Sequence, residues 1–273
     1  MTKTWRVTVW GTRGSIPVAG ADFLEYGGNT TCISVDCGEE FVIFDAGSGL
    51  TRLGYDLSRR GIKKVHLLLS HLHMDHVIGL FGFQLLHNPE AEIHLYGEAR
   101  NGVSFEKQLE RLVGAPYWPL GLHDFRAHII IHEIRVGDCL KLSDQDSLLI
   151  RTMRGNHPNQ CLLYRLENAA KSVVHSLDCE MNDEIFSALA DFARDCDLFI
   201  LDANFIRTDL QPGWGHSTWE QGIALRHAAN AGMALMTHYN WEYTDNFLRE
   251  QERLALQADP ASRFARENMK IEL

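Results

Sequence analysis

The chain has 273 residues, with 26 Lys and Arg against 36 Asp and Glu, a net charge of −10, and 45% apolar residues. This composition is typical of a soluble globular protein, and the acidic balance argues against a sequence-independent grip on a long nucleic-acid backbone, which needs a basic surface. The sequence contains no run of about 18 apolar residues, no secretory signal pattern and no CxxC pair among its six cysteines. We therefore expect a cytoplasmic protein with reduced thiols and no membrane attachment.

In the first half of the chain, short apolar runs alternate with helical patterns. The segment Gly114–Asp124 is less regular, contains Pro116, Trp118 and Pro119, and is predicted to be a loop near the mouth of a site. Strands are predicted at Trp5–Trp10, Thr31–Asp36, Phe41–Phe44, Val65–Leu69 and Ile93–Tyr96, and helices at Ser48–Arg60, His76–His87 and Gly102–Val113.

The second half repeats this alternation, with no internal repeat and no linker. Strands are predicted at His128–Ile134, Ser147–Met153, Cys161–Leu166, Val173–Leu177, Leu198–Leu201 and Ala234–Met236, and helices at Asn182–Arg194, Thr218–Ala231 and much of Asp245–Asn268, interrupted near Pro260. Strand clusters in each half, each followed by helices, predict an α/β fold: an αββα sandwich of two mixed β-sheets flanked by helices, with residues 1–273 forming a single domain.

The segment Ser70–His76, SHLHMDH, carries the strongest chemical signal. It follows a buried strand and precedes a helix, so its side chains gather on a loop at the edge of a sheet. Three imidazoles and a carboxylate are costly to desolvate together, and a metal cation is the usual compensation. His71 and His73 can point the same way in an extended turn, whereas Asp75 and His76 can face a second ion.

This segment resembles the HxHxDH signature of the metallo-β-lactamase superfamily at every specified position, and later motifs of the family follow in order along nearly the whole chain. The resemblance implies a metallo-β-lactamase fold with two divalent metal ions, for which zinc suits the ligands best and manganese or iron are alternatives. It assigns His71, His73 and His157 to one ion and Asp75, His76 and His238 to the other, with Asp178 as the bridge between them. Asp45 is implied to brace the segment Ser70–His76, which we call the metal loop.

The implied chemistry is hydrolysis. Two cations a few ångströms apart lower the pKa of a bridging water, so that a metal-bound hydroxide is available near neutral pH, and they polarise the bond that is attacked. Asp75 could additionally orient this water.

A second motif, GHST at Gly215–Thr218, narrows the type of hydrolase. It resembles the HST motif of the phosphodiesterase branch, which includes the tRNA 3′-end endonucleases and in which this histidine contacts the scissile phosphate. His216 matches that histidine, and Asp202 stands where the branch has its supporting acidic residue, although the tRNA enzymes typically have Glu there. An imidazolium held by a carboxylate could stabilise the charge of the transition state and protonate the leaving oxygen. The alternative is that His216 has no catalytic role and that Ser217 and Thr218 simply cap the next helix.

The expected substrate is a small phosphodiester, such as a cyclic nucleotide or a short oligonucleotide. The tRNA enzymes generally hold the tRNA body with a long basic arm, and the interval between His157 and Asp178 is too short for one. A lactone or thioester hydrolase of the same fold is the main alternative, followed by a mononuclear-iron sulfur dioxygenase and a non-catalytic binding module. Members of the superfamily often form homodimers, but no segment here specifies one.

Two further features receive a structural interpretation. Arg13, in the loop TRGSIP, is interpreted as a solvated loop charge, with a contact to substrate phosphate as the alternative. Trp118, Trp214 and Trp241 are interpreted as core residues, with stacking on a base as the alternative.

Overall fold

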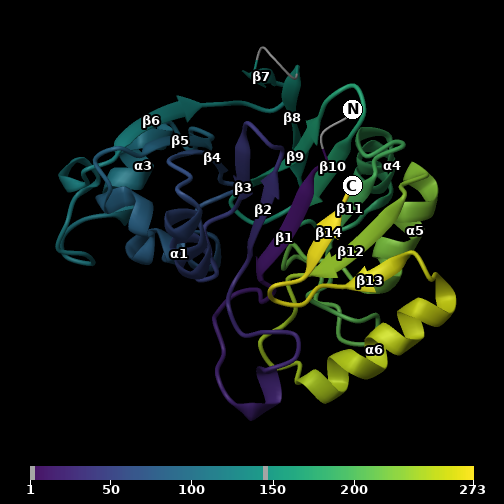
Figure 1. Cartoon of the computed structure of the whole chain (residues 1–273). Helices are drawn as coiled ribbons and strands as arrows, with labels where there is room; N and C mark the ends of the chain where they lie inside the picture. The colour runs from purple at the N-terminus through teal and green to yellow at the C-terminus, as the bar shows by residue number, and fades with distance from the viewer. Residues whose placement is uncertain (1–3, 144–146) are drawn as a thin grey trace.

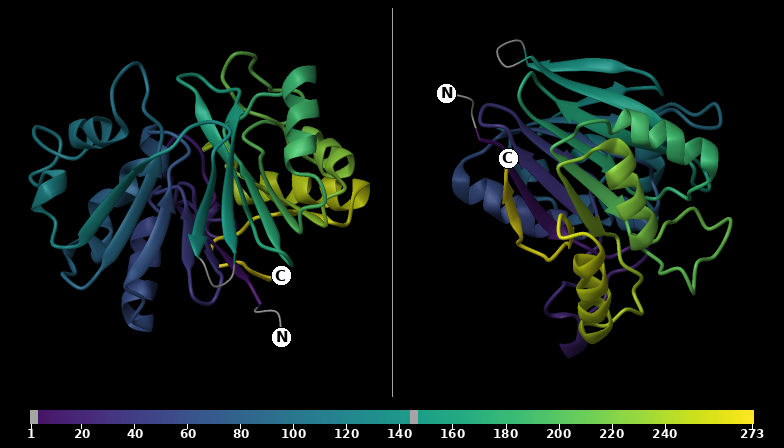
Figure 2. Two further views of the ribbon diagram at one scale, coloured as in Figure 1. Left: turned by 90° about the horizontal axis from the view of Figure 1, so that it is seen from above. Right: turned by 90° about the vertical axis from the view of Figure 1, so that its right-hand side faces the viewer.

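The computed structural model describes residues 4–143 and 147–273 and shows two seven-stranded β-sheets packed face to face, with helices outside both (Figures 1 and 2). The predicted αββα sandwich of mixed sheets is therefore confirmed. No helix in the described ranges is long and apolar enough to cross a membrane.

The first sheet has the strand order β14-β1-β2-β3-β4-β5-β6. Strands β14, β1, β2 and β3 pair antiparallel, and β3 to β6 pair parallel. Their bounds are β1 Arg6–Gly11, β2 Cys32–Asp36, β3 Phe41–Phe44, β4 Lys64–Leu68, β5 Glu92–Gly97, β6 His128–Glu133 and β14 Lys270–Glu272.

The second sheet has the order β13-β12-β11-β10-β9-β8-β7. Strands β7 to β10 pair antiparallel, and β10 to β13 pair parallel. Their bounds are β7 Cys139–Ser143, β8 Leu148–Gly155, β9 Cys161–Glu167, β10 Ser172–Ser176, β11 Leu198–Asp202, β12 Met233–Thr237 and β13 Ser262–Phe264.

Apolar side chains form three buried layers, one between the sheets and one under the helices on each outer side. In the central layer, Val35 and Phe44 of the first sheet pack with Tyr164 and Ile200 of the second. The α-helices are α1 Leu50–Arg60, α2 Met74–Val77, α3 Phe105–Leu112, α4 Asp183–Phe192, α5 Trp219–Ala229 and α6 Asp245–Ala258, and short 3₁₀ helices cover Ala21–Phe23, Ile78–Gly82, Gln84–His87 and Leu122–Asp124.

The continuous helix predicted at His76–His87 is wrong. The segment is α2 followed by two 3₁₀ helices, and part of its backbone bonds to the loop after β3 instead of continuing an α-helix. The His76 carbonyl accepts from the Ala46 amide at 2.7 Å, and the Gly79 amide donates to the Ala46 carbonyl at 2.8 Å. A Cβ at position 79 would lie 2.0 Å from the Gly47 carbonyl oxygen, so this close approach requires glycine.

The predicted helix Asp245–Asn268 is also too long, since α6 ends at Ala258. Asp259 is extended, as expected before Pro260, and its side chain accepts from Ser262 Oγ at 2.7 Å. The chain then forms β13 and β14, which add one strand to each sheet. These two short strands and the edge strand β7 were not predicted from the sequence.

Candidate metal centre and its neighbours

The predicted site residues lie at the carboxyl ends of strands from both sheets. Asp45 follows β3, the segment Ser70–His76 follows β4, His157 follows β8, Asp178 follows β10 and His238 follows β12. Three of them have left-handed backbone, with φ of 59° at Asp45, 55° at Asp178 and 64° at His238. This conformation is unfavourable outside glycine and is concentrated at functional sites. Here it turns the chain sharply at the strand end, so that each side chain faces the others.

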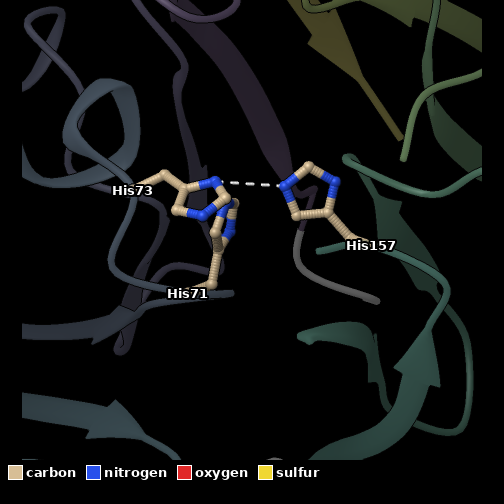
Figure 3. Close-up of side chains that lie close together, drawn as sticks. All are labelled: His71, His73 and His157. Carbon is tan, nitrogen blue, oxygen red and sulfur yellow. Dashed lines mark hydrogen bonds between the residues drawn. The ribbon is translucent and has the colours of Figure 1, made fainter. Parts of the chain in front are cut away.

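One group of potential ligands consists of His71, His73 and His157, whose ring nitrogens converge (Figure 3). His73 Nδ1 and His157 Nε2 lie 3.1 Å apart. His157 Nδ1 donates to the Gly215 carbonyl at 3.0 Å, which leaves Nε2 with its lone pair directed at the group. Gly215 has φ +83°, and a Cβ there would lie 2.2 Å from His157 Nδ1, so the glycine of the GHST motif permits this support.

A second group consists of Asp75, His76, Asp178 and His238, all of them buried. Asp178 Oδ1 lies 3.1 Å from both His76 Nε2 and His238 Nε2. Asp178 Oδ2 lies 3.5 Å from His157 Nε2 and 3.8 Å from His71 Nε2. One carboxylate therefore presents an oxygen to each group, which is the position predicted for a bridging ligand.

Asp45 lies behind this arrangement and is fully buried. It accepts from the Ser70 amide at 2.8 Å and from Ser70 Oγ at 3.0 Å, and its Oδ2 lies 2.9 Å from His76 Nδ1. The contact with Nδ1 fixes the imidazole tautomer that has its lone pair on Nε2, the atom facing Asp178. Asp45 thus holds both the metal loop and one potential ligand, as the family resemblance implied.

The electrostatics of these groups fit metal ions. Burial lowers the pKa of His71, His73 and His157, so their imidazoles are neutral and available as ligands. Within the described residues, His71 Nε2 and Asp178 Oδ1 are buried and make no hydrogen bond, although several nitrogens are close to them. Atoms that converge without hydrogen-bonding geometry are expected where each atom is directed at a common cation. The mixture of imidazole and carboxylate suits zinc, manganese or iron.

The histidine of the GHST motif lies beside both groups. His216 Nδ1 is 2.8 Å from Asp202 Oδ2, and both side chains are buried. The His216 ring stacks on His238 with a centroid distance of 5.3 Å and meets His157 edge-on at 5.2 Å. Burial lowers the pKa of His216, but the charge and hydrogen bond of Asp202 outweigh it and raise the pKa to about 9. The pair therefore favours an imidazolium.

The residues that follow His216 cap helix α5, while His216 itself contacts Asp202. Thr218 Oγ1 accepts from the Gln221 amide at 3.2 Å, and Gln221 Oε1 accepts from the Thr218 amide at 3.0 Å, which forms a capping box at the start of α5. Ser217 Oγ donates to the Cys179 carbonyl. Capping explains Thr218 but not His216, whose ring points away to Asp202.

The interpretation of Arg13 as a solvated charge is wrong, because the side chain is fully buried. Its Nε donates to the Gly27 carbonyl at 2.7 Å, and one Nη donates to the carbonyls of Tyr243 at 2.6 Å and Asn240 at 3.2 Å. Arg13 thus anchors the loop Thr12–Ser15, which we call the TRGS loop, to two other loops. No local sequence signal identifies this role, since the carbonyl partners lie 14 to 230 residues away.

The same loop contacts the second group directly. The Ser15 amide donates to Asp75 Oδ2 at 2.7 Å, and Ser15 has φ 65°. A Cβ at Gly14 would lie 2.5 Å from the His238 ring, so glycine allows the loop to pack against that imidazole. The TRGS loop therefore positions Asp75 and His238.

We expect Arg13→Met to lower the free energy of unfolding by about 3 kcal/mol, because it leaves three buried carbonyls without their donor. Urea denaturation would measure this loss. Arg52→Met is the control: Arg52 is half exposed, and its 3.1 Å contact with Glu267 should contribute about 1 kcal/mol or less. Equal effects of the two substitutions would contradict the anchoring role of Arg13.

Two seven-stranded sheets with convergent histidine and aspartate groups at one edge define a metal-dependent hydrolase of the αββα class. Comparison with known proteins agrees with this assignment of the fold. The Beta-lactamase superfamily domain matches residues 33–239, so the chain belongs to the metallo-β-lactamase superfamily.

The curated relatives include ribonuclease Z of Methanococcus aeolicus, 26% identical over 146 residues, or 52% of this chain and 42% of that protein. Ribonuclease Z of Nitrosopumilus maritimus is 21% identical over 277 residues, or 82% of this chain and 88% of that protein. The match thus spans less than half of the first relative but most of the second. The crystal structure of the metallo-β-lactamase fold protein YhfI from Bacillus subtilis has a TM-score of 0.77 at 20% identity, covering 99% of this chain and 100% of that one.

Proposed function

We propose that this protein is a phosphodiesterase that hydrolyses a small phosphodiester with two divalent metal ions, one in each ligand group and Asp178 between them. Zinc is the proposed metal, with manganese and iron as alternatives. In this proposal residues 1–273 act as one domain. A cytoplasmic location is part of the proposal, because Cys32, Cys161, Cys179 and Cys196 are buried thiols that form no disulfide.

The observation that carries the proposal is the buried His216–Asp202 pair, 2.8 Å apart and packed against His238 and His157. A lactone or thioester hydrolase has no need of a cation at this place. A phosphodiester transition state gathers negative charge on its equatorial oxygens and on the leaving oxygen. The His216 imidazolium could stabilise the charge on the equatorial oxygens and give its proton to the leaving oxygen, while Asp202 holds the ring.

The remaining residues of the site have distinct tasks in this reaction. When bound, divalent cations would supply a water of lowered pKa and would polarise the phosphate. Asp75 orients the attacking water, and the Ser15 amide, 2.7 Å from Asp75 Oδ2, fixes that carboxylate. The relatives named ribonuclease Z support this substrate class, because ribonucleases hydrolyse phosphodiester bonds.

A small substrate is favoured over a tRNA body. Between His157 and Asp178 the chain forms only β9 and β10, which pair antiparallel from Ser172↔Glu167 onward. No arm protrudes from this fully described interval. The net charge of −10 likewise gives no basic surface for a long backbone.

A panel of three ester types tests the proposal. Protein reconstituted with zinc or manganese is assayed with bis-p-nitrophenyl phosphate, a lactone and a thioester. We expect kcat/KM to be at least about tenfold higher for the phosphodiester, because only this substrate uses the His216 cation. Preferred turnover of the lactone or the thioester would leave the metal centre intact but would overturn the proposed substrate class.

A further inference from the structure

An open apolar cavity of about 480 Å³ lies next to the metal loop. One wall is formed by Met74, which belongs to the metal loop, and by Ile78 and Phe81, which follow it. The other wall is formed by Leu112, Tyr117 and Trp118, at the end of α3 and in the loop after it. Cavities that bind small ligands in proteins have volumes of roughly 300 to 1,000 Å³ and mainly apolar walls. This cavity therefore has the size and lining of a ligand subsite.

The cavity adjoins the segment that carries several of the potential ligands. Met74 lies between the potential ligands His73 and Asp75 in the sequence, and its side chain is 54% exposed. Met74 therefore links the cavity lining to the segment that carries a member of each ligand group. Because methionine is flexible and polarisable, it can adapt to a flat ring placed on it.

The aromatic wall is presented by a turn. The amides of Tyr117 and Trp118 both donate to the Gly114 carbonyl, at 2.9 and 2.8 Å, which holds the two rings at the cavity. Trp118 packs against Phe81 with a centroid distance of 4.9 Å. Tyr117 is 77% exposed, an unusual state for a large aromatic side chain with no covering partner in the described chain.

Two polar groups make the cavity selective. Trp118 Nε1 is buried and has no hydrogen-bond partner among the described residues. It is an unused donor at the cavity wall, which a ligand reaches once the indole shifts. Arg111 lines the same cavity and is exposed, so it adds a cation at the rim in a chain of net charge −10. Flat aromatic surface, one buried donor and one cation match a nucleobase attached to a phosphate.

We propose that this cavity binds the nucleobase of the phosphodiester, on the ester that stays attached to phosphorus; this inference rests on the proposed function. His216, which would protonate the leaving oxygen, comes from the loop after β11 of the second sheet, whereas the cavity is built by segments that follow β4 and β5 of the first. His216 and the cavity thus approach the ligand groups from different sheets. The leaving group therefore lies toward His216, and the retained nucleoside lies over Met74 and Trp118.

The first test compares two esters with the same leaving group, thymidine 5′-(p-nitrophenyl phosphate) and methyl p-nitrophenyl phosphate. We expect the metal-loaded protein to have a kcat/KM about tenfold higher for the thymidine ester, because stacking of one base on aromatic side chains contributes an effect of this size. Trp118→Leu and Tyr117→Ala should abolish this preference and leave turnover of the methyl ester within about twofold. Tyr55→Ala, at an exposed tyrosine on α1, is the control and should change neither rate.

The second test measures binding without turnover. Calorimetry with adenosine 5′-monophosphate and ribose 5-phosphate compares ligands that differ only in the base. We expect at least about tenfold tighter binding of the nucleotide to the wild type and equal binding of the two ligands to Trp118→Leu.

The possible failures are distinguishable. Turnover of both esters at equal rates, with equal binding of the two phosphates, would overturn the nucleobase subsite and leave the proposed function standing. Lack of turnover of either ester would overturn the proposed function, and the subsite with it. A dimer that becomes monomeric in Tyr117→Ala and Trp118→Leu, with both phosphates bound alike by the wild type, would overturn the proposal in favour of a second copy of the chain over the cavity.

Discussion

Replacing His216 with alanine is expected to slow hydrolysis of a dinucleoside monophosphate by about 10²–10⁴-fold, the range typical for loss of a general acid. The same substitution should slow hydrolysis of bis-p-nitrophenyl phosphate by only about tenfold. The leaving group explains the difference: a sugar alkoxide needs a proton as the bond breaks, whereas p-nitrophenolate leaves without one. Steady-state kinetics with both substrates would measure the two ratios.

Asp202→Asn separates the charge of the pair from its shape. The amide preserves the side-chain volume but removes the carboxylate that lies 2.8 Å from His216 Nδ1 and keeps the ring protonated. We expect the same leaving-group dependence as in His216→Ala, with a smaller loss. His66→Ala is a matched control, because His66 forms a comparable buried contact with Glu40 at 2.9 Å but belongs to neither ligand group. Equal losses for both substrates in His216→Ala would contradict the general-acid role and indicate a structural one.

The metal loop could be read from the sequence because its information is local. Within SHLHMDH the spacing of four chemically distinctive residues defines the motif, and the preceding apolar run identifies the strand that delivers it. His157, Asp178 and His238 are each isolated in the sequence, and only the family order of motifs connects them. The structure brings them to one edge: His157 follows the antiparallel strand β8, whereas Asp178 and His238 stand in left-handed turns that no propensity scale predicts.

The errors share one physical cause, which is that distant partners compete with local preference. The segment His76–His87 has an apolar helical pattern, but the Ala46 backbone captures its hydrogen bonds. Arg13 looks like any loop arginine until Gly27, Asn240 and Tyr243 surround it with carbonyls. The irregular, proline-containing segment 114–124 predicted a loop near the site, but not that Trp118 lines an open cavity instead of the core.

Metal binding should respond to substitutions in a graded order. We expect the wild type to bind two equivalents of zinc, and His73→Ala, which removes a member of the first group only, to retain about one. Asp178→Ala should weaken both equivalents, because the oxygens of this carboxylate lie 3.1 Å from His76 and His238 and 3.5 Å from His157. Asp45→Asn, which perturbs the support of His76 and of the metal loop but removes no ligand, should reduce affinity by about 10–100-fold. Elemental analysis after dialysis would give the counts, and competition with a chelator the affinities.

This order also discriminates a true dinuclear centre from adventitious binding. Glu106, Glu110 and His123 form another group that could hold a cation, but all three are exposed, and exposed carboxylates keep most of their hydration. His123→Ala should therefore leave the count at two. If His123→Ala lowered the count as much as His73→Ala, with circular dichroism unchanged in both, one of the two ions would belong to the surface. The bridging role of Asp178 would then be wrong, and His216 would act beside a single metal ion.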